Sequence, residues 1–596
     1  MAKLGYIFFL VLGIIIFNSC SNRWDENKSD NSTNIVYKDP TLKKSYGAYL
    51  AGRVAHLRRN FNKAADYYIQ ALNDDPKNQD LISRLYVILA SQGRIEEAAK
   101  YARQSLKNGD NNNFTYIIIA VEEMKKGQFQ NVNTTINKLD GPVYKQFIIP
   151  LMSAWAYAGL NDHDKAMKAL SGISKEKSFK ALYHFHAGML NDYFDRKDEA
   201  QKHYEIIVNE ETLEMSFRAL QVITNFYLRT GQKDKAVALS QKYNDEKLMA
   251  DMLRRLDNNV AKADPEKTQK IIDNPNKGMS EALFSIAATL RQGASGIDIA
   301  HIFICLSIYS NQDYDLAKLL LADILENREM YEEANEIYEQ IPESSEAYYS
   351  VQVKKANNLV ALQDYPGAEL LLKSLALETP NNYQLLLDLG DVLRIRNKQE
   401  EAVKYYEYAI KSVPQIESQH WILYYALGIS YERSGQWKKA EQNLKTAIDL
   451  SQNHYLVLNY LGYSWIKRGE NIEEAFGMIV DAYNQSPNDG NIADSLGWAF
   501  YILGMYDNAI VYLEKANQME PANALISDHL GDAYWFGGRR NEARFQWKHA
   551  LTLEDESGEV DRKATKRKIR DGLSQNKVPD FDKKIIEEHI SAIIKE

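Results

Sequence analysis

The sequence predicts an all-α protein, an α-solenoid of about fourteen helix-turn-helix units, and a break in the repeat leaves a division into two halves open. The first reason is a fixed interval of 34 residues between small side chains. It is seen in three series: Ala64, Ala98, Val132, Ala166 and Ala200; Ala300, Ala334, Ala368 and Ala402; and Ala475, Ala509 and Ala543. A constant period of this length is typical of stacked repeats rather than of several unrelated domains. The second reason is the low content of turn-forming residues, 30 Gly and 13 Pro in 596 residues, which disfavours a protein of many short strands.

Residues 1–19, the first element, have the organisation of a signal peptide. Lys3 provides a short positive start, and residues 4–17 carry no charge. A run of this length fits the ~7–15 residues of a signal-peptide core better than the ~20 residues of a membrane span. The run ends at Ser19 and Cys20 and resembles a bacterial lipoprotein signal, in which the cysteine is lipidated and becomes the mature N-terminus.

The lipoprotein resemblance implies a lipidated Cys20 followed by a flexible tether, together residues 20–43. Acyl chains contribute ~0.8 kcal/mol per buried CH₂, and more than one chain is needed for stable anchoring. By analogy with lipoprotein sorting, Ser21 favours the outer membrane with the body facing the periplasm, and the inner membrane is the alternative. An uncleaved N-terminal anchor and an ordinary secretory signal are two further interpretations.

Each unit of the body carries a small residue, a large residue and a proline at fixed offsets. In the first unit Gly52 precedes Ala64 by 12 residues, Tyr68 follows Ala64 by four, and Pro76 follows it by 12. Apolar residues at i, i+3, i+4 and i+7 predict two amphipathic helices per unit. We expect the glycine to allow close helix approach, the large residue to fill the gap between units, and the proline to end the second helix.

The repeat frame divides the body into an N-terminal array, residues 44–243, and a C-terminal array, residues 278–555. Residues 244–277 break the frame, because Ala236 and Ala300 are 64 residues apart rather than twice 34. This stretch is predicted to be a degenerate repeat or a joint between two halves. Residues 556–596 are expected to form capping helices, which repeat arrays need at an exposed end.

The spacing and the residue types resemble the tetratricopeptide repeat, TPR, over about fourteen units. The resemblance implies a right-handed superhelix in which the first helix of each unit lines an inner groove that binds proteins or extended peptides. The closing units, "DSLGWAFYILGMYDNAIVYLEKA" and "DHLGDAYWFGGRRNEARFQWKHAL", behind a lipoprotein-like signal, look like the large TPR proteins of Gram-negative envelopes. Those proteins are scaffolds in pilus, secretion or cell-wall assembly.

By the same resemblance, aromatic, amide and acidic side chains occupy the groove positions of the last units. These candidate groove residues are Tyr425, Asn459, Tyr463, Asn491, Asp494, Trp498, Tyr501, Asp528, Asp532 and Trp535. Rings supply contact area and carboxylates pair with Lys or Arg, so this surface would suit an extended peptide with apolar and basic side chains. Two alternatives remain: the rings pack between units, and the aspartates lie on a solvated face. His529, beside them, has no partner that the frame would bring near it.

The sequence holds no pattern that predicts catalysis or metal binding. The motifs of metalloproteases, P-loop enzymes, serine hydrolases and EF-hands are missing, and the two cysteines, Cys20 and Cys305, form no C-x-x-C pair. His184 and His186, two apart, do not share a helix face. The net charge of −9 argues against a general nucleic-acid binder, and the basic run at 562–570 is expected to be a solvated helix face. We therefore expect no catalytic residue, metal, cofactor, nucleic acid or small-molecule substrate.

Together these observations predict a non-enzymatic, membrane-tethered TPR scaffold that binds protein or peptide partners on the periplasmic side of the cell envelope. One alternative is a cytoplasm-facing TPR adaptor held by an uncleaved anchor. Two others are a regulatory subunit of an envelope enzyme complex and a structural subunit that binds mainly itself.

Overall fold

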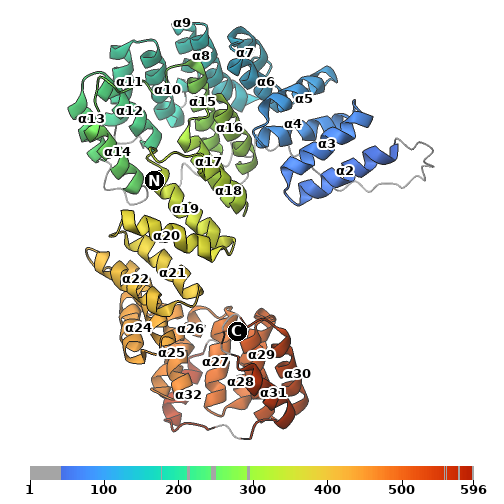
Figure 1. Ribbon diagram of the computed structural model, residues 1–596, viewed down its shortest axis with the longest axis vertical. Coiled ribbons are helices and arrows are strands. Elements are labelled where there is room, and N and C mark those ends of the chain that lie inside the picture. Colours follow the sequence, from blue (N-terminus) through green and yellow to red (C-terminus); the bar gives the residue numbers. More distant parts are fainter. Residues whose placement is uncertain are drawn as a thin grey trace. The chain divides into compact units, whose positions relative to one another are not determined.

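The computed structural model describes residues 42–175, 177–210, 215–242, 250–291, 296–555, 558, 560–574 and 577–593. These residues form helices and connecting turns with no strand among them, which confirms the all-α class (Figure 1). They fall into two compact units, residues 1–364 (unit 1) and 365–596 (unit 2). The predicted signal, Cys20 and nearly all of the tether lie outside the described residues. Within them, no helix combines the length and apolarity needed to cross a bilayer.

Unit 1 begins with consecutive antiparallel helix pairs. The pairs are α2 (Leu42–Leu57) with α3 (Phe61–Asp74), α4 (Gln79–Ser91) with α5 (Ile95–Lys107), α6 (Asn113–Lys125) with α7 (Phe129–Ile136), α8 (Ile149–Gly159) with α9 (His163–Leu170), α10 (Lys180–Tyr193) with α11 (Lys197–Asn209), and α12 (Phe217–Arg229) with α13 (Lys233–Lys242). The first helices of these pairs, which we call the first-helix row of unit 1, are α2, α4, α6, α8, α10 and α12.

The repeated glycine permits the close approach that the sequence predicted. A Cβ added at Gly52 would lie 2.6 Å from the ring of Tyr68, and one at Gly188 would lie 2.4 Å from the ring of Tyr204. Both rings are fully buried, so the large residue of the second helix fills the space that the glycine leaves. The turns follow the same local rules, because Gly93 ends α4 at φ 71°, where L side chains are strained.

After α13 the chain leaves the simple stack. The single helix α14 (Ala250–Lys262) packs against α12 and α13 and also against α19 (Tyr348–Ala361). The stretch 244–277 therefore lies inside unit 1, and the boundary between the compact units falls after Asp364 instead. Helices that come both before and after α14 in the sequence therefore hold it in place, and a degenerate repeat or a joint at 244–277 stays a prediction.

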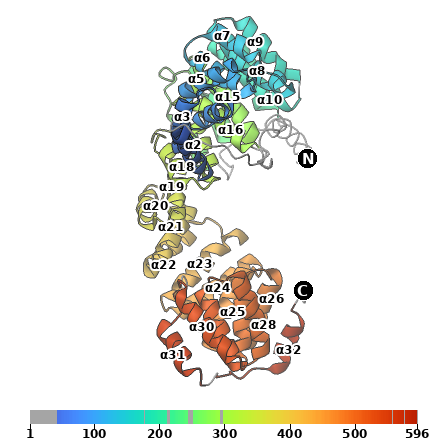
Figure 2. The same ribbon diagram turned by 90° about the vertical axis from the view of Figure 1, so that its right-hand side faces the viewer.

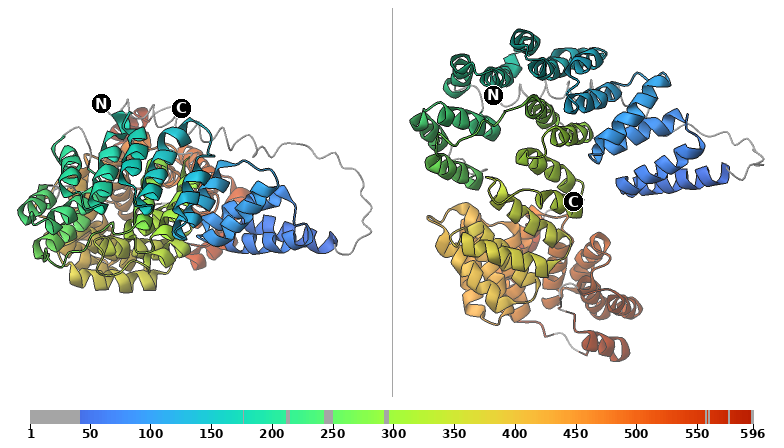
Figure 3. Two further views of the ribbon diagram at one scale, coloured as in Figure 1. Left: turned by 90° about the horizontal axis from the view of Figure 1, so that it is seen from above. Right: turned by 45° about the horizontal axis from the view of Figure 1, so that its top comes forward.

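The next hairpin returns to the beginning of unit 1. Helix α15 (Pro275–Arg291) packs against α8 and α10, while α16 (Ile297–Ser310) packs against α4 and α6, and both lie inside the arc of the earlier helices (Figures 1 and 3). A Cβ at Gly278 would lie 2.0 Å from Trp155, which shows how closely α15 approaches α8. Helix α16 is buried on most sides, as a helix surrounded by others requires. Unit 1 ends with α17 (Asp315–Glu326), α18 (Tyr331–Tyr338) and α19.

Unit 2 keeps the regular stack. It contains α20 (Tyr365–Glu378), α21 (Tyr383–Ile395) with α22 (Gln399–Ser412), α23 (Trp421–Arg433) with α24 (Trp437–Ser451), α25 (Tyr455–Arg468) with α26 (Ile472–Gln485), α27 (Gly490–Ile502) with α28 (Tyr506–Met519), and α29 (Ala524–Phe536) with α30 (Arg540–Thr552). The first helices of the pairs, α21, α23, α25, α27 and α29, form what we call the first-helix row of unit 2.

Two short helices complete unit 2 on opposite sides of the stack (Figures 1 and 2). Helix α31 (Arg562–Asp571) packs against α30, at the end of the stack where a cap is expected. Helix α32 (Lys583–Ser591) packs instead against α26, two pairs back, where a Cβ at Gly477 would lie 2.6 Å from the ring of His589. The C-terminal segment therefore fastens several repeats together as well as covering the last one.

Candidate functional site

The candidate groove residues lie on four consecutive helices of the first-helix row, α23, α25, α27 and α29. The 34-residue period gives equivalent positions on each helix the same orientation relative to the stack. The side chains differ in exposure. Asn491 is exposed, Tyr425, Asn459, Tyr463, Trp498 and Trp535 are half-buried, and Asp494, Tyr501, Asp528 and Asp532 are buried.

The three aspartates form a buried polar network with residues of neighbouring helices. Asp494 on α27 lies 2.9 Å from Nδ1 of His529 on α29. Lys568 on α31 donates to Asp528 over 2.6 Å and to Asp532 over 2.8 Å. Trp547 Nε1 donates to Asp532 over 2.8 Å. The aspartates therefore hold the end of the stack together, and they are not a solvated face.

Two charged residues in this network have roles that the sequence did not predict. His529 was expected to have no partner, yet the preceding first helix supplies Asp494, one repeat plus one residue earlier. Lys568 was assigned to a solvated face, yet only 15% of its side chain is exposed. The sequence did carry a signal for this packing, because Thr565 and Lys568 are three residues apart and therefore share one face of α31. In the structure both side chains contact Asp528.

Burial and close charges set the ionisation of this network. Burial alone would lower the pKa of His529, but Asp494, with Asp528 and Asp532, raises it above its usual value. Burial raises the pKa of Asp532 to about 6, against the opposing effect of Lys568. Burial would lower the pKa of Lys568, but the two aspartates raise it, so the ammonium stays charged. Each buried charge has an opposite charge beside it, as buried ions require.

The aromatic residues of the row divide between packing and exposure. Trp498 stacks on His529 with ring centroids 3.9 Å apart, and on Tyr501 at 4.6 Å. Trp535 donates Nε1 to the carbonyl of Leu573, 2.8 Å away, in the segment after α31. Tyr425 packs edge-on against Tyr460 at 5.8 Å. Tyr501 is buried, whereas Tyr425, Tyr463, Trp498 and Trp535 are all half-buried, so these four rings pack against their neighbours and keep part of their surface exposed.

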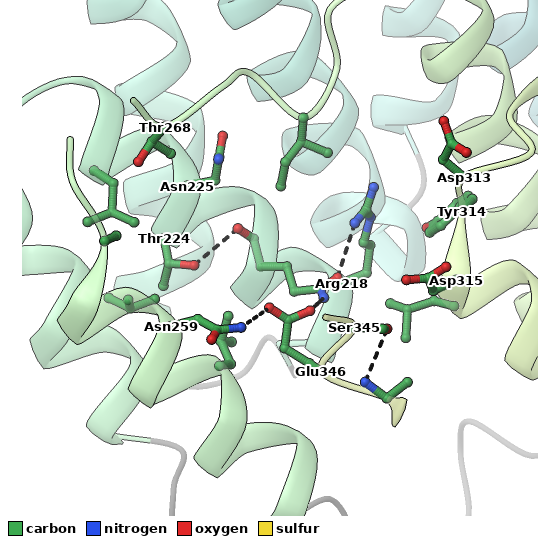
Figure 4. A pocket seen from close by; sticks show the side chains of 18 of the residues that line it. Arg218, Thr224, Asn225, Asn259, Thr268, Asp313, Tyr314, Asp315, Ser345 and Glu346 are labelled. Atoms are coloured by element: carbon green, nitrogen blue, oxygen red, sulfur yellow. Dashed lines mark hydrogen bonds between the residues drawn. The ribbon is translucent and has the colours of Figure 1, made fainter. Parts of the chain in front are cut away.

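Unit 1 contains a separate cavity that the sequence did not predict, which we call the unit 1 pocket. Its volume is about 390 Å³, and α12, α14, the α16–α17 turn and the segment before α19 line it (Figure 4). Asp313, Tyr314 and Asp315 lie on one side of the pocket in the view, across from Thr224 and Asn225, with Glu346 below. Burial raises the pKa of Asp315. These residues are far apart in sequence and share no period, so no sequence pattern predicts the pocket.

The described residues contain no cluster of three or more His, Cys, Asp or Glu side chains that could hold a metal ion. Cys305 is buried, as expected, with its Sγ 3.3 Å from the carbonyl oxygen of Ser91. Burial raises the pKa of its thiol to about 12, which makes it an unreactive core side chain. His186 packs against Trp155, whereas His184 contacts His203.

Comparison with known proteins finds the same repeat. Two family models described as tetratricopeptide repeat match residues 353–415 and 493–523. A TPR repeat-containing protein of Pseudomonas aeruginosa is 29% identical over 149 residues, 25% of this chain and 24% of that protein. The BBSome complex member BBS4 of Bos taurus is 25% identical over 153 residues, 26% of this chain and 28% of that protein. The chain thus spans about a quarter of each relative's length.

Among solved structures, the APC/C hetero-tetramer Cut9–Hcn1 is similar over 89% of this chain and 97% of that chain, with 13% identity and a TM-score of 0.37. In the protein described here, the two family matches fall on helix pairs, the first on α19 to α22 and the second on α27 and α28. These pairs carry the repeat frame of glycine, alanine and large residue, with Gly390 against Tyr406 and Gly497 against Leu513. The chain therefore contains tetratricopeptide repeats, matched at residues 353–415 and 493–523.

Proposed function

We propose that this protein is a non-enzymatic scaffold, tethered to a membrane through Cys20, that captures protein or extended-peptide partners on the periplasmic side of the cell envelope. The first-helix row of unit 2 is the proposed binding surface. The observation that carries the proposal is the set of half-exposed side chains at repeat spacing on this row, above all Tyr425 and Tyr463. Aromatic side chains in such positions supply much of the energy of protein interfaces.

The acidic end of the row is occupied by a segment of the chain itself. Asp528 and Asp532 already hold Lys568 of the chain's own α31. These carboxylates are therefore engaged within the protein, and a partner would contact the other side chains of the row. The tyrosines of α23 and α25 and the exposed Asn491 of α27 continue the surface beyond this contact.

Unit 1 contributes less to this proposed surface, because its own helices cover four of its six first helices. Helices α15 and α16 pack against α4, α6, α8 and α10, so a partner cannot reach those helices without displacing the hairpin. We therefore assign partner capture to unit 2.

Cross-linking in intact cells tests the capture. The double variant Tyr425→Ala, Tyr463→Ala is expected to lose the partners that the wild-type protein captures. The double variant Tyr405→Ala, Tyr408→Ala removes two tyrosines from α22, a second helix, and is expected to capture them normally. Equal capture by the two double variants would contradict the proposed surface.

Labelling with a radioactive fatty acid tests the tether. The wild-type protein is expected to incorporate the label and Cys20→Ala to lose it, because Cys20 is the proposed acceptor. An unlabelled wild-type protein, or a label that survives Cys20→Ala, would favour the alternative of a cytoplasm-facing adaptor with an uncleaved anchor.

A further inference from the structure

The unit 1 pocket has a lining that matches one kind of chemical group. Its polar side chains come from α12, α14 and two turns, and its apolar walls include Leu228, Leu256 and Val260. At about 390 Å³ it is at the lower end of the range of ligand sites, ~300–1,000 Å³. The pocket belongs neither to the repeat frame nor to the proposed binding surface of unit 2.

The hydrogen-bond donors around the pocket are already engaged within the protein. Arg218 is buried and forms an ion pair with Glu281, with Nε 2.9 Å from the carboxylate, while its guanidinium also lies over the ring of Tyr314. Lys277 donates to Asp273 over 2.8 Å. Asn225 donates to the carbonyl of Gln269 over 2.9 Å. A ligand that needs donors would have to displace these bonds.

The acceptors, in contrast, exceed the positive charge available to them. Glu346 receives only neutral donors, from Gln221 at 3.0 Å and Asn259 at 2.9 Å. Asp315 has Lys318 at 3.8 Å, beyond hydrogen-bond distance. Among the described residues, no cation is recorded within salt-bridge distance of Asp313 or Glu346. Three carboxylates thus border one cavity whose own cations, Arg218 and Lys277, are paired with Glu281 and Asp273, and among the described residues the only further ammonium group within salt-bridge distance of them is that of Lys318, 3.8 Å from Asp315.

We propose that the unit 1 pocket binds an aliphatic ammonium or guanidinium group. The cationic head would lie among Asp313, Asp315 and Glu346, and the aliphatic stem would pack on the apolar wall of α12 and α14 (Figure 4). Lysine and arginine combine an apolar stem with a charged head in this way. A free alkylamine presents the same group, so the ligand is either a small amine or a side chain of a partner protein.

Calorimetric titration of the full-length protein in detergent with four cationic probes tests the proposal. Nα-acetyl-lysine amide and Nα-acetyl-arginine amide represent protein side chains, and 1,5-diaminopentane and agmatine represent free amines. Nα-acetyl-citrulline amide has nearly the shape of the arginine probe without its charge. At least one cationic probe is expected to bind saturably, and the citrulline probe at least tenfold more weakly. Stronger binding of the acetylated probes indicates a protein ligand, and stronger binding of the free amines indicates a small molecule.

Three variants connect the binding to the pocket. Asp315→Asn with Glu346→Gln is expected to weaken binding at least tenfold by removing two charges. Thr268→Trp, at the half-buried rim, is expected to weaken it by filling the cavity without changing any charge. Asp164→Asn, on α9 with 94% of its side chain exposed, is the matched control and should bind as the wild type does. The absence of saturable binding by all four cationic probes, or binding that neither pocket variant changes, would overturn the proposal.

Discussion

Single residues set how closely the helices of each pair approach. At Gly390 a Cβ would lie 2.4 Å from the ring of Tyr406, and at Gly531 it would lie 2.4 Å from Trp547. Each aromatic ring occupies the space that the missing side chain leaves, and each is buried. A single added methyl group therefore has no free volume, because helix packing leaves few voids.

Gly390→Ala should lower the free energy of unfolding by about 1–3 kcal/mol, the usual cost of overpacking a filled core. Gly47→Ala is the matched control, because Gly47 is also inside a helix but has no atom within 4 Å of the added Cβ. Alanine there should be neutral or stabilise α2 by up to about 1 kcal/mol. Urea denaturation of both variants measures the difference, and equal effects would show that the glycine position has no packing role.

Histidines give the two units opposite responses to pH. In unit 1, burial lowers the pKa of His186 and His301 to about 3 and of His203 to about 4, so these rings fold in the neutral form. The unfolded chain binds more protons than the folded chain below pH ~6.5. The free energy of unfolding of unit 1 should therefore fall by up to about 1.4 kcal/mol per histidine for each pH unit below that value. In unit 2 the pKa of His529 is raised instead. The stability that protonated His529 gives to unit 2 is therefore complete below pH ~6.5, and it is lost as the pH rises through the pKa of His529 in the folded protein.

Hydrogen exchange between pH 5 and pH 8 measures these responses, with α8 and α10 reporting on unit 1 and α27 and α29 on unit 2. The protection of each amide is corrected for the pH dependence of its intrinsic exchange rate. His529→Gln should remove the loss of protection of α27 and α29 at high pH and leave α8 and α10 unchanged. The same loss in His529→Gln as in the wild type would show that the Asp494–His529 pair does not cause it.

At the scale of elements, most of the fold could be predicted from the sequence, because helix pairs are local. The small residue, the large residue and the turn that define a pair lie within one 34-residue period, as with Gly52 and Tyr68. The return of α15 and α16 could not be predicted in this way, because their contacts join residues such as Trp155 and Gly278 with no shared period. The largely apolar sequence of α16 was the available signal, since a helix at a surface keeps a polar face.

The candidate site was predicted in part for the same reason. The row of side chains on α23 to α29 follows from the period, but the partners of its aspartates do not. His529 and Lys568 belong to neighbouring elements, and the contact between α31 and α29 depends on how the chain turns after Thr552. A charge reversal at Asp528 and Asp532 would therefore break an internal contact, and it would not test partner binding.

Lys568→Met should release α31 from the end of unit 2. It leaves Asp528 and Asp532 buried without a cation, which costs about 3–5 kcal/mol for a broken buried pair. Hydrogen exchange in α31 and thermal unfolding of unit 2 measure the effect. Lys566→Met, exposed on the same helix, is the control, and adding Asp528→Asn and Asp532→Asn to Lys568→Met should restore part of the stability. If Lys566→Met had the same effect as Lys568→Met, the buried network would not be the cause.

At the scale of the whole molecule, the two units have different architectures built from one repeat. Unit 1 covers α4, α6, α8 and α10 with α15 and α16, while unit 2 fastens its stack with α31 and α32. The proposed division of work follows from this difference: unit 2 captures partners on α23 to α27, and unit 1 offers the unit 1 pocket. The proposed lipid at Cys20 would keep both at the membrane surface.

The central claim is that the first-helix row of unit 2 binds a partner, and an affinity measurement tests it most directly. A protein captured by cross-linking would be purified and titrated calorimetrically into the full-length chain and its two double tyrosine variants. The Tyr425→Ala, Tyr463→Ala variant should bind at least tenfold more weakly than the wild type, because buried interface tyrosines contribute about 1–3 kcal/mol each. The Tyr405→Ala, Tyr408→Ala variant should retain the wild-type affinity, whereas equal affinities for all three proteins would contradict the account.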